Sequence, residues 1–431
     1  MLTGLYKLSV SKILRCNNGA MPRFCLKNDK IIDMKLEKLP EEFVQAKPVL
    51  EKIIEHGFEA YFVGGSVRDI LLGREIHDVD IATSAYPEEI KDIFPYTIDV
   101  GIEHGTVLVL AGKSEAEHYE ITTFRTESKY TDYRRPDHVD FVRDLREDLK
   151  RRDFTVNAFA CDVNGQIIDL FDGLTDLKER RLTAVGSALE RFNEDALRIM
   201  RAMRFAATLD FQIENKTFLA MCESAHLLEK ISVERIFIEF DKLLLGQDWR
   251  NGLTLLLKSG AYKYLPDLQD SALEKVLTDL SVDFHFQNSE QAWAALLTRF
   301  SNIDVKTFLR KWKVSNEFAK FVADLVSAYE LDSWDLMSLY HFGLEKVLLV
   351  DELKVAYGLK INREQAVTIN NQLQIHDKSE IVIAGKDLME EFSLEPGPEL
   401  GKILKIIEEK IVKNELKNEQ AAIFAEVKKM L

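Results

Sequence analysis

The stretch 62-FVGGSVRDILLGREIHDVDIA-82 decides how the first part of this chain folds, because it joins two apolar, strand-like runs through a glycine turn and a short helix-like segment. The second run carries Asp78 and Asp80. Side chains two residues apart on a strand share a face, which places these Cα atoms about 6–7 Å apart. Like charges this close repel unless a cation lies between them, and Mg²⁺ prefers carboxylate oxygens. The pair therefore indicates a Mg²⁺ site, although solvated carboxylates at a strand end are the commoner source of such a pattern alone.

The glycine turn ahead of the aspartates favours a metal site over solvated carboxylates. Gly65 and Ser66 follow a predicted strand and open a predicted helix, so that backbone N–H groups face a polyphosphate. Arg68, in the first helical turn, is placed to hold a phosphate oxygen. A glycine turn alone is often an ordinary strand–helix connection. Together with the Asp-x-Asp pattern that follows, it predicts a nucleoside triphosphate bound with a metal ion.

Two later stretches add candidates for the same site. Glu120, within YEITTFR, is expected to be a third acid beside the aspartates, or else a solvent-facing strand residue. In KRRDFTVNA, Arg152 is placed to contact the triphosphate, Asp153 the ribose hydroxyls and Asn157 the local turn. A solvated run of charges explains this second cluster equally well.

The segment 193-NEDALRIMRAMRFAA-207 has helical spacing, which makes Asp195 and Arg198 neighbours and lets Arg201 and Arg204 continue a basic stripe. A simple i,i+3 salt bridge is one explanation. Base recognition is another, because a carboxylate accepts from an exocyclic amine and a guanidinium donates to the acceptor beside it. Cytosine and adenine both offer this pair of groups, whereas uracil and guanine would leave buried polar groups unpaired. The segment thus predicts selection of C and A without a nucleic-acid template.

The composition sets limits on the protein class. A length of 431 residues favours two to four domains, and 46% hydrophobic with 30% charged residues is typical of a globular chain. No run approaches the roughly 18 apolar residues that span a membrane. The four cysteines form no CxxC pair, which argues against a disulfide framework or zinc site and fits a cytoplasmic location. The net charge of −15 excludes a uniformly basic nucleic-acid binder but not local basic patches.

The pattern along the chain predicts an α+β protein. Strand-like runs dominate up to about residue 170, and the Asn164-Gly165 pair between two of them indicates a hairpin. Beyond about residue 187 the spacing is helical, with breaks near 266–270 and 377–385. We expect residues 1–33, which are rich in basic residues, to be a disordered extension before a domain that begins at Met34.

Six motifs in order carry a family resemblance: GGSVRDILLG…DVD, EITTFR, RRDFTVNA, FDGLTDL…RLTAVG, EDALRIMRAMRFA and SVERIFIEF. They resemble those of class II tRNA nucleotidyltransferases, the CCA-adding enzymes of the DNA polymerase beta-like superfamily, in particular the shorter enzymes of low-GC Gram-positive bacteria. The resemblance implies a nucleotidyltransferase head with a mixed sheet and helices, followed by an all-α neck, body and tail. We place the head at 34–180, the neck at 181–267, the body at 268–376 and the tRNA-binding tail at 377–431.

The resemblance also implies roles for individual residues. Asp78 and Asp80 correspond to the Mg²⁺ ligands and Glu120 to the third carboxylate. The implied nucleotide contacts are Gly65, Arg68 and Arg152 in the head and Asp195, Arg198, Arg201 and Arg204 in the neck. Further implied elements are a hinge at 171–177, bracing residues Ser232, Glu234 and Arg235, and a flexible loop at 127–141 tied to the switch from C to A addition.

The expected activity is template-independent addition of C, C and A to the 3′ end of tRNA. The expected partners are CTP, ATP, the tRNA 3′ end and acceptor arm, and a second copy in a homodimer, with no membrane contact. A bacterial poly(A) polymerase is the main alternative, but such enzymes tend to have basic C-terminal tails and this chain ends in a mixed-charge segment. Addition of CC or A alone is a second alternative. A non-catalytic RNA-binding protein is disfavoured by the retained carboxylates and the Asp-Arg pair.

Overall fold

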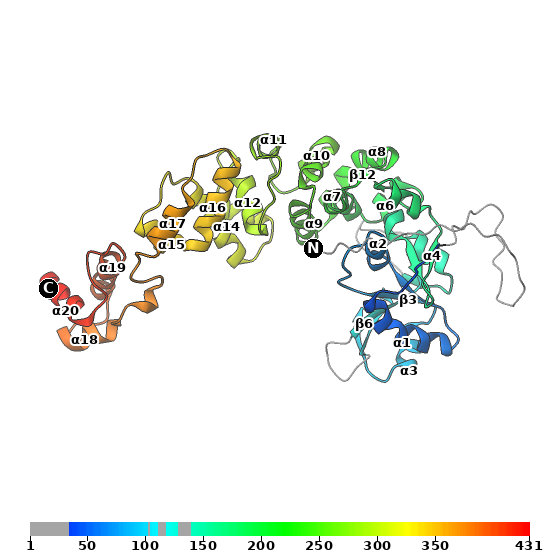
Figure 1. Ribbon diagram of the computed structural model, residues 1–431, viewed down its shortest axis with the longest axis horizontal. Coiled ribbons are helices and arrows are strands. Elements are labelled where there is room, and N and C mark those ends of the chain that lie inside the picture. Colours follow the sequence, from blue (N-terminus) through cyan, green and yellow to red (C-terminus); the bar gives the residue numbers. More distant parts are fainter. Residues whose placement is uncertain (1–33, 102–103, 111–117, 128–138) are drawn as a thin grey trace, which may run out of the picture. The chain divides into compact units, whose positions relative to one another are not determined.

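The computed structural model describes residues 34–101, 104–110, 118–127 and 139–431 (Figure 1). These residues form two compact units. The first contains the described residues up to Glu239 together with Lys258–Tyr264, and the second contains Phe240–Leu257 and Leu265–Leu431. The expected extension 1–33 and most of the expected loop 127–141 lie outside the described residues. The finer division into head, neck, body and tail stays a prediction.

An eight-stranded mixed sheet forms the base of the first unit and has the order β1-β10-β9-β2-β3-β6-β5-β4. The strands are β1 (Met34–Lys35), β2 (Ala60–Val63), β3 (Asp80–Thr83), β4 (Thr97–Gly101), β5 (Thr106–Leu110), β6 (His118–Thr123), β9 (Phe159–Cys161) and β10 (Gln166–Asp169). The pair β3–β6 is parallel, and the other neighbours are antiparallel. The predicted hairpin is confirmed, because Gly165, at φ +83°, turns the chain between β9 and β10.

Helices cover this sheet and continue beyond it. They are α1 (Glu41–Glu55), α2 (Gly65–Leu71), α3 (Pro87–Ile93), α4 (Leu145–Lys150), α5 (Gly173–Lys178), α6 (Ala188–Glu194), α7 (Leu197–Leu209), α8 (Asn215–Ser224), α9 (Val233–Leu244) and α10 (Trp249–Ser259). The expected α+β class is confirmed. One small difference lies in the helical part, where β12 (Gln212–Ile213) pairs with β11 (Arg181–Leu182). It forms because Asp210, in the left-handed conformation, ends α7 and redirects the chain.

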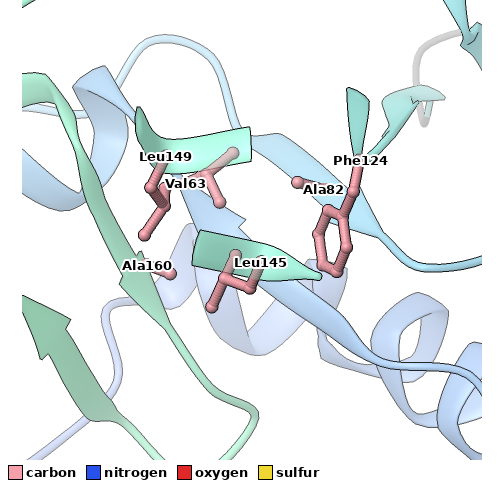
Figure 2. Close-up of a cluster of buried hydrophobic side chains, with 6 residues drawn as sticks. All are labelled: Val63, Ala82, Phe124, Leu145, Leu149 and Ala160. Carbon is pink, nitrogen blue, oxygen red and sulfur yellow. The ribbon is translucent and has the colours of Figure 1, made fainter. Parts of the chain in front are cut away.

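A buried apolar cluster fixes the strands that carry the candidate site. Its members are Val63, Ala82, Phe124, Leu145, Leu149 and Ala160, which come from β2, β3, the residue after β6, α4 and β9 (Figure 2). Leu145 and Leu149 lie one helical turn apart, so α4 presents both to the sheet. Replacing Leu149 by alanine would cost about 2–5 kcal/mol. The ends of β2, β3 and β9 are therefore held at fixed positions relative to one another.

The second unit is helical throughout its described secondary structure. Its helices after α10 are α11 (Asp270–Asp279), α12 (Ser289–Leu297), α13 (Val305–Lys311), α14 (Asn316–Tyr329), α15 (Leu336–Phe342), α16 (Leu344–Ala356), α17 (Arg363–Asn370), α18 (Gly385–Phe392), α19 (Pro398–Val412) and α20 (Gln420–Met430). Buried rings of Phe240, Trp293 and Trp312 pack together, with centroids 4.8 to 5.4 Å apart. Within the described ranges, no helix is both long enough and apolar enough to cross a membrane.

Candidate active site

The predicted acidic residues lie at one end of the parallel strand pair. Asp80 is the first residue of β3 and stands opposite Glu120 of β6 in the register. Asp78 precedes the strand rather than belonging to it, and both aspartates are exposed while Val79 between them is half-buried. The alternation expected of a strand thus extends beyond its hydrogen-bonded part. Because the pairing is parallel, both strands bring their acids to the same edge of the sheet.

The charges around Asp80 are those of a site for a cation. Asp80 is exposed as a residue, but surrounding protein atoms partly shield its carboxyl group from water, which raises its pKa; Arg152 opposes this shift, and the carboxylates of Glu120 and Asp78 add to it. Within the described ranges, no group of three or more His, Cys, Asp or Glu side chains is already arranged as a complete metal site. The donor chemistry nevertheless fits, because Asp78, Asp80 and Glu120 offer only hard carboxylate oxygens to a divalent ion.

The glycine turn lies against this acidic edge. Gly64 precedes α2 with φ +73°, and a Cβ on it would lie 3.0 Å from Nη1 of Arg152 and 3.6 Å from Oδ2 of Asp80. Only glycine therefore lets the N-terminus of α2 approach both side chains. The sequence indicated a turn formed by both glycines and assigned the nucleotide contact to Gly65, whereas Gly64 is the residue that approaches Arg152 and Asp80. Ser66 is buried and donates to the carbonyl of Val63 at 3.1 Å, so its hydroxyl closes the turn.

Arg68 joins this turn to the segment that follows β8 (Val139–Phe141) and α4. It is 8% exposed, and its Nη1 donates to Oδ1 of Asn157 at 2.5 Å. Its Nε and Nη2 donate to the carboxylate of Asp69, both at 2.9 Å. Asn157 closes a short 3-10 turn at Thr155–Asn157 and is itself buried. The structure thus brings together Arg68 and Asn157, which are far apart in the sequence.

Arg152 is positioned by a residue that sequence reasoning did not select. The fully buried Asp148 accepts from Nη2 of Arg152 at 3.2 Å and from Nη2 of Arg151 at 2.7 Å. Burial alone would raise the pKa of Asp148, but the two guanidinium groups hold it below its ordinary value. Asp148 therefore stays ionised and keeps Arg152 near Asp80. Asp148 precedes Arg151 by three residues and Arg152 by four, and this helical spacing in the sequence could have identified it as their partner.

Asp153 is the anchor of the next group. It is 8% exposed, and its Oδ2 accepts from Nε and Nη2 of Arg201 at 2.8 and 2.6 Å. Its Oδ1 accepts from the backbone N–H of Phe154 at 2.8 Å and from Nδ2 of Asn157 at 3.1 Å. Burial opposes ionisation, but Arg201 and Asn157 together lower the pKa of Asp153 to about 2. These contacts tie the segment after α4 to α7. The ribose contact expected for Asp153 stays a prediction.

Arg204 is held by Glu239 of α9, another residue that sequence reasoning missed. Glu239 is 7% exposed, and its Oε2 accepts from Nε of Arg204 at 2.5 Å while its Oε1 lies 3.7 Å from Nη1 of Arg201. The ring of Phe205 lies beneath three guanidinium carbons, at 3.9 Å from that of Arg204, 5.2 Å from that of Arg68 and 5.3 Å from that of Arg201. Cation–π contacts of this kind add to the positioning of these arginines.

The Asp195–Arg198 segment is organised differently from the continuous helix expected there. Asp195 ends α6 in an extended conformation, and its Oδ1 accepts from the backbone N–H of Leu197 at 3.0 Å, which starts α7. Its Oδ2 accepts from Nη2 of Arg235 of α9 at 2.7 Å. Arg198 is 8% exposed and donates to Oε2 of Glu194 at 2.5 Å and to the carbonyl of Arg151 at 2.9 Å. The break is local, because an Asx cap replaces one turn of helix.

Comparison with known proteins places this arrangement in a family. The family described as "Poly A polymerase head domain" matches residues 60–183, "Probable RNA and SrmB- binding site of polymerase A" matches 210–271, and "tRNA nucleotidyltransferase domain 2 putative" matches 284–427.

Individual relatives match over most of the chain. The CCA-adding enzyme of Lactococcus lactis subsp. lactis (strain IL1403) is 99% identical over 398 residues, which cover 92% of this chain and 100% of that protein. The CCA-adding enzyme of Streptococcus suis (strain 05ZYH33) is 58% identical over 403 residues, or 92% and 99% of the two chains. The solved structure of the Bacillus stearothermophilus CCA-adding enzyme in complex with CTP is similar with a TM-score of 0.81 at 38% identity, covering 91% of this chain and 98% of that one. The resemblance inferred from the motifs is confirmed, and the chain belongs to the family of CCA-adding tRNA nucleotidyltransferases.

Proposed function

We propose that this chain adds C, C and A in turn to the 3′ end of tRNA, using CTP and ATP and no nucleic-acid template. The observation that carries the proposal is the edge of the head sheet, where Asp80 faces Glu120 across parallel strands and the Gly64 turn approaches Asp80 and Arg152. This edge combines the acids and the phosphate-facing backbone that nucleotidyl transfer needs. The tRNA substrate implies action in the cytoplasm.

The head residues have the following roles in this proposal. The family's nucleotidyltransferase head implies a divalent metal ion, which we assign as Mg²⁺ held by Asp78 and Asp80, with Glu120 as the third carboxylate beside them. When bound, such an ion supplies activation of the primer hydroxyl and neutralisation of charge on the reacting phosphates. Arg152 binds the triphosphate, and the backbone N–H groups at the start of α2 orient it. The tRNA 3′-hydroxyl then attacks the α-phosphate, and pyrophosphate leaves.

Arg68 and the neck residues bind and select the incoming nucleotide. We assign base recognition to Asp195 and Arg198 and phosphate or ribose contacts to Arg68, Arg201 and Arg204. Asp195 is oriented by Arg235 at 2.7 Å, so its carboxylate is fixed before a base arrives. A preoriented hydrogen-bonding site discriminates strongly against a base with the wrong donor or acceptor. The same residues serve for CTP and for ATP because both bases present an amine beside an acceptor.

One assay tests the proposal and separates it from its rivals. The protein is incubated with a tRNA that lacks its 3′ CCA, with Mg²⁺ and with CTP, ATP, both, GTP or UTP, and the extended ends are sequenced. We expect CC with CTP alone, CCA with both nucleotides and no extension with GTP or UTP. A long run of A would instead identify a poly(A) polymerase, and CC or A alone would identify a partial enzyme. No extension under any condition would leave a non-catalytic RNA-binding protein.

A further inference from the structure

Arg191 of α6 contacts both residues that the proposed function assigns to base recognition, although it is not itself one of them. Its carbonyl accepts from the backbone N–H of Asp195 at 3.3 Å and from Nη1 of Arg198 at 3.1 Å. Its Nη2 donates to Oε1 of Glu194 at 2.5 Å, and Nη1 of Arg198 donates to Oε2 of the same carboxylate at 2.5 Å. The carboxylate of Glu194 therefore holds two guanidinium groups, one on each oxygen.

The same two guanidinium groups are bonded to the segment that leads into Arg152. Nη1 of Arg191 donates to the carbonyl of Lys150 at 3.2 Å, and Nη2 of Arg198 donates to the carbonyl of Arg151 at 2.9 Å. Lys150 is the last residue of α4, and Arg151 follows it directly. These two bonds join the residues assigned to the base to the segment that carries the residue assigned to the triphosphate.

The bonds between these side chains are largely shielded from water. The side chain of Arg191 is 13% exposed, that of Arg198 is 9% exposed and that of Glu194 is 25% exposed. Hydrogen bonds between charged groups are stronger than those between neutral groups, and a low local dielectric strengthens them further. Arg191 therefore restricts the rotation of the Glu194 carboxylate, and this carboxylate in turn fixes the direction of the Arg198 guanidinium.

Capping of a helix end is a simpler explanation for part of this arrangement. Cationic donors stabilise the carbonyl groups at the C-terminal end of a helix, and the carbonyls of Lys150 and Arg151 lie at the end of α4. Capping does not account for the carboxylate of Glu194 that two arginines share. It also does not account for Nε of Arg191, which is buried and lacks a hydrogen-bond partner among the residues that the structure describes. A buried donor without a partner is costly, and such local costs are typical of functional sites.

We propose that Arg191 is a positioning residue for base recognition. This inference rests on the proposed function, which assigns Arg198 to the base and Arg152 to the triphosphate of the same nucleotide. Because Arg191 is bonded to both Glu194 and Lys150, it fixes the Arg198 guanidinium relative to the triphosphate site. A cytosine or adenine whose phosphates are bound then meets a correctly directed donor. Uracil presents its donor and acceptor in exchanged positions and leaves polar groups unpaired.

The test changes the side chain of Arg191 in two ways. Arg191→Met removes the guanidinium but keeps a long, unbranched side chain that suits a helix, and Arg191→Gln replaces it if the methionine variant is unfolded. Arg191→Lys is the conservative variant, because its ammonium group can still pair with Glu194. The matched control is Arg74→Met. Nη1 of Arg74 donates at 3.0 Å to the carbonyl of Thr208, in the last turn of α7, so this variant also removes a guanidinium from a helix end.

The measurements separate binding from catalysis. Each full-length protein is titrated calorimetrically with CTP, ATP and UTP in the presence of Mg²⁺, and thermal unfolding is recorded for each variant. Arg191→Met should lower the preference for CTP and ATP over UTP, taken as ratios of Kd values, by about tenfold. Arg191→Lys should recover most of this preference. Arg74→Met should keep the wild-type ratios, even where its unfolding temperature is lower.

The alternative outcomes identify which part of the reasoning fails. If Arg191→Met weakens the binding of all three nucleotides by the same factor, or changes only the unfolding temperature, Arg191 caps α4 and the inference is wrong. A wild type that binds UTP as tightly as CTP would refute the inference together with the assigned base recognition. If the wild type prefers CTP and ATP but adds neither to tRNA lacking CCA, the proposed function alone is refuted.

Discussion

Replacing Asp153 by asparagine removes one buried charge while keeping the size of the side chain. In the structure its carboxylate accepts two N–H groups of Arg201, at 2.6 and 2.8 Å, one of Asn157 and the backbone N–H of Phe154. The NH₂ group of an asparagine at this position would point at N–H groups that now donate to the carboxylate, so those hydrogen bonds would be lost. The guanidinium of Arg201, whose side chain is 34% exposed, would then lack its principal counter-charge.

The loss in the free energy of unfolding follows both from the cost of breaking this ion pair and from the lowered pKa of Asp153. Removing one partner of a buried ion pair costs about 3–5 kcal/mol. The lower end applies because the Arg201 side chain is 34% exposed and keeps Glu239 at 3.7 Å. The pKa of Asp153, lowered from 3.8 to about 2, corresponds to a stabilisation of roughly 2 kcal/mol by the ionised carboxylate. Both place the expected loss in the free energy of unfolding at roughly 2–3 kcal/mol at neutral pH.

The pH dependence has a definite sign. The pKa of Asp153 is lower in the folded protein than in the unfolded chain, so its contribution to stability is fully present above the ordinary value of 3.8. This contribution is lost as the pH falls through that value towards about 2. Wild type and Asp153→Asn should therefore differ most in stability at neutral pH, and the difference should shrink in acid.

The assay has to report on the first unit. All four tryptophans, Trp249, Trp293, Trp312 and Trp334, lie in the second unit, so tryptophan fluorescence follows that unit only. Far-UV circular dichroism of the full chain in urea, combined with hydrogen exchange of the β2 and β3 amides, follows the first. We expect a fluorescence transition close to that of the wild type and earlier loss of protection in β2 and β3.

The matched control is Asp210→Asn, the same substitution in the same unit. Asp210 pairs with Arg180 at 2.7 Å, but their side chains are 40% and 59% exposed, so the expected cost is at most about 1 kcal/mol. Equal losses for Asp153→Asn and Asp210→Asn would refute the argument from burial. In the extension assay, Asp153→Asn should raise KM for CTP and ATP to a similar degree, because the proposed function assigns Arg201 to the binding of both nucleotides. A rise for one nucleotide only would contradict the assigned role of the network.

Substitutions in the candidate site and in the predicted hinge segment 171–177 have definite expected outcomes. Asp78→Ala and Asp80→Ala should each abolish incorporation of every nucleotide while tRNA binding remains, and normal turnover in either variant would exclude the assigned metal ligands. Arg198→Ala should relax the choice between bases more than it slows transfer of a cognate nucleotide, and a uniform loss with unchanged base preference would count against base recognition. In Gly173→Ala the new Cβ would lie 2.5 Å from the carbonyl of Thr155, so we expect the free energy of unfolding to fall by about 1–3 kcal/mol. In the control Gly401→Ala, the new Cβ would have no atom within 4 Å, so we expect urea unfolding to show a gain of roughly 0.5–1 kcal/mol from the stabilised helix.

The local parts of the site could be predicted from the sequence, and the long-range parts could not. The glycine turn, the aspartate pair and the basic stripe of α7 are encoded within short windows, where strand and helix periodicity fix which side chains share a face. The partner of β3 is different, because the chain reaches β6 only after β4 and β5. Glu120 was chosen because Tyr119 and Ile121 beside it would face the other side of a strand, and only the parallel register shows that it stands opposite Asp80.

The choice of charge partners also lay beyond periodicity. Arg201 and Arg204 were expected to face a nucleotide, yet each is held by an acid from another element, Asp153 or Glu239. The spacing of residues along a helix predicts the direction of each side chain, but it does not predict which acidic residue of another element will lie beside it. The break at Asp195 had the same origin, since a helix start inside an otherwise continuous pattern depends on the cap that the aspartate makes with Leu197.

Under the proposed function, these buried acids account for the way a chain with a net charge of −15 would hold a triphosphate. A buried carboxylate with a lowered pKa stays ionised at neutral pH, so Asp153 and Asp148 fix the guanidinium groups of Arg201 and Arg152 without a change of protonation. The conformational entropy of these long side chains is therefore lost when the protein folds, and little further entropy is lost when the nucleotide binds. Crystal structures with and without CTP should accordingly show Arg152 and Arg201 in the same rotamers, with their bonds to Asp148 and Asp153 intact. If either arginine broke its bonds to Asp148 or Asp153 to reach the triphosphate, the side chains would rearrange on binding, and the site would not be preorganised.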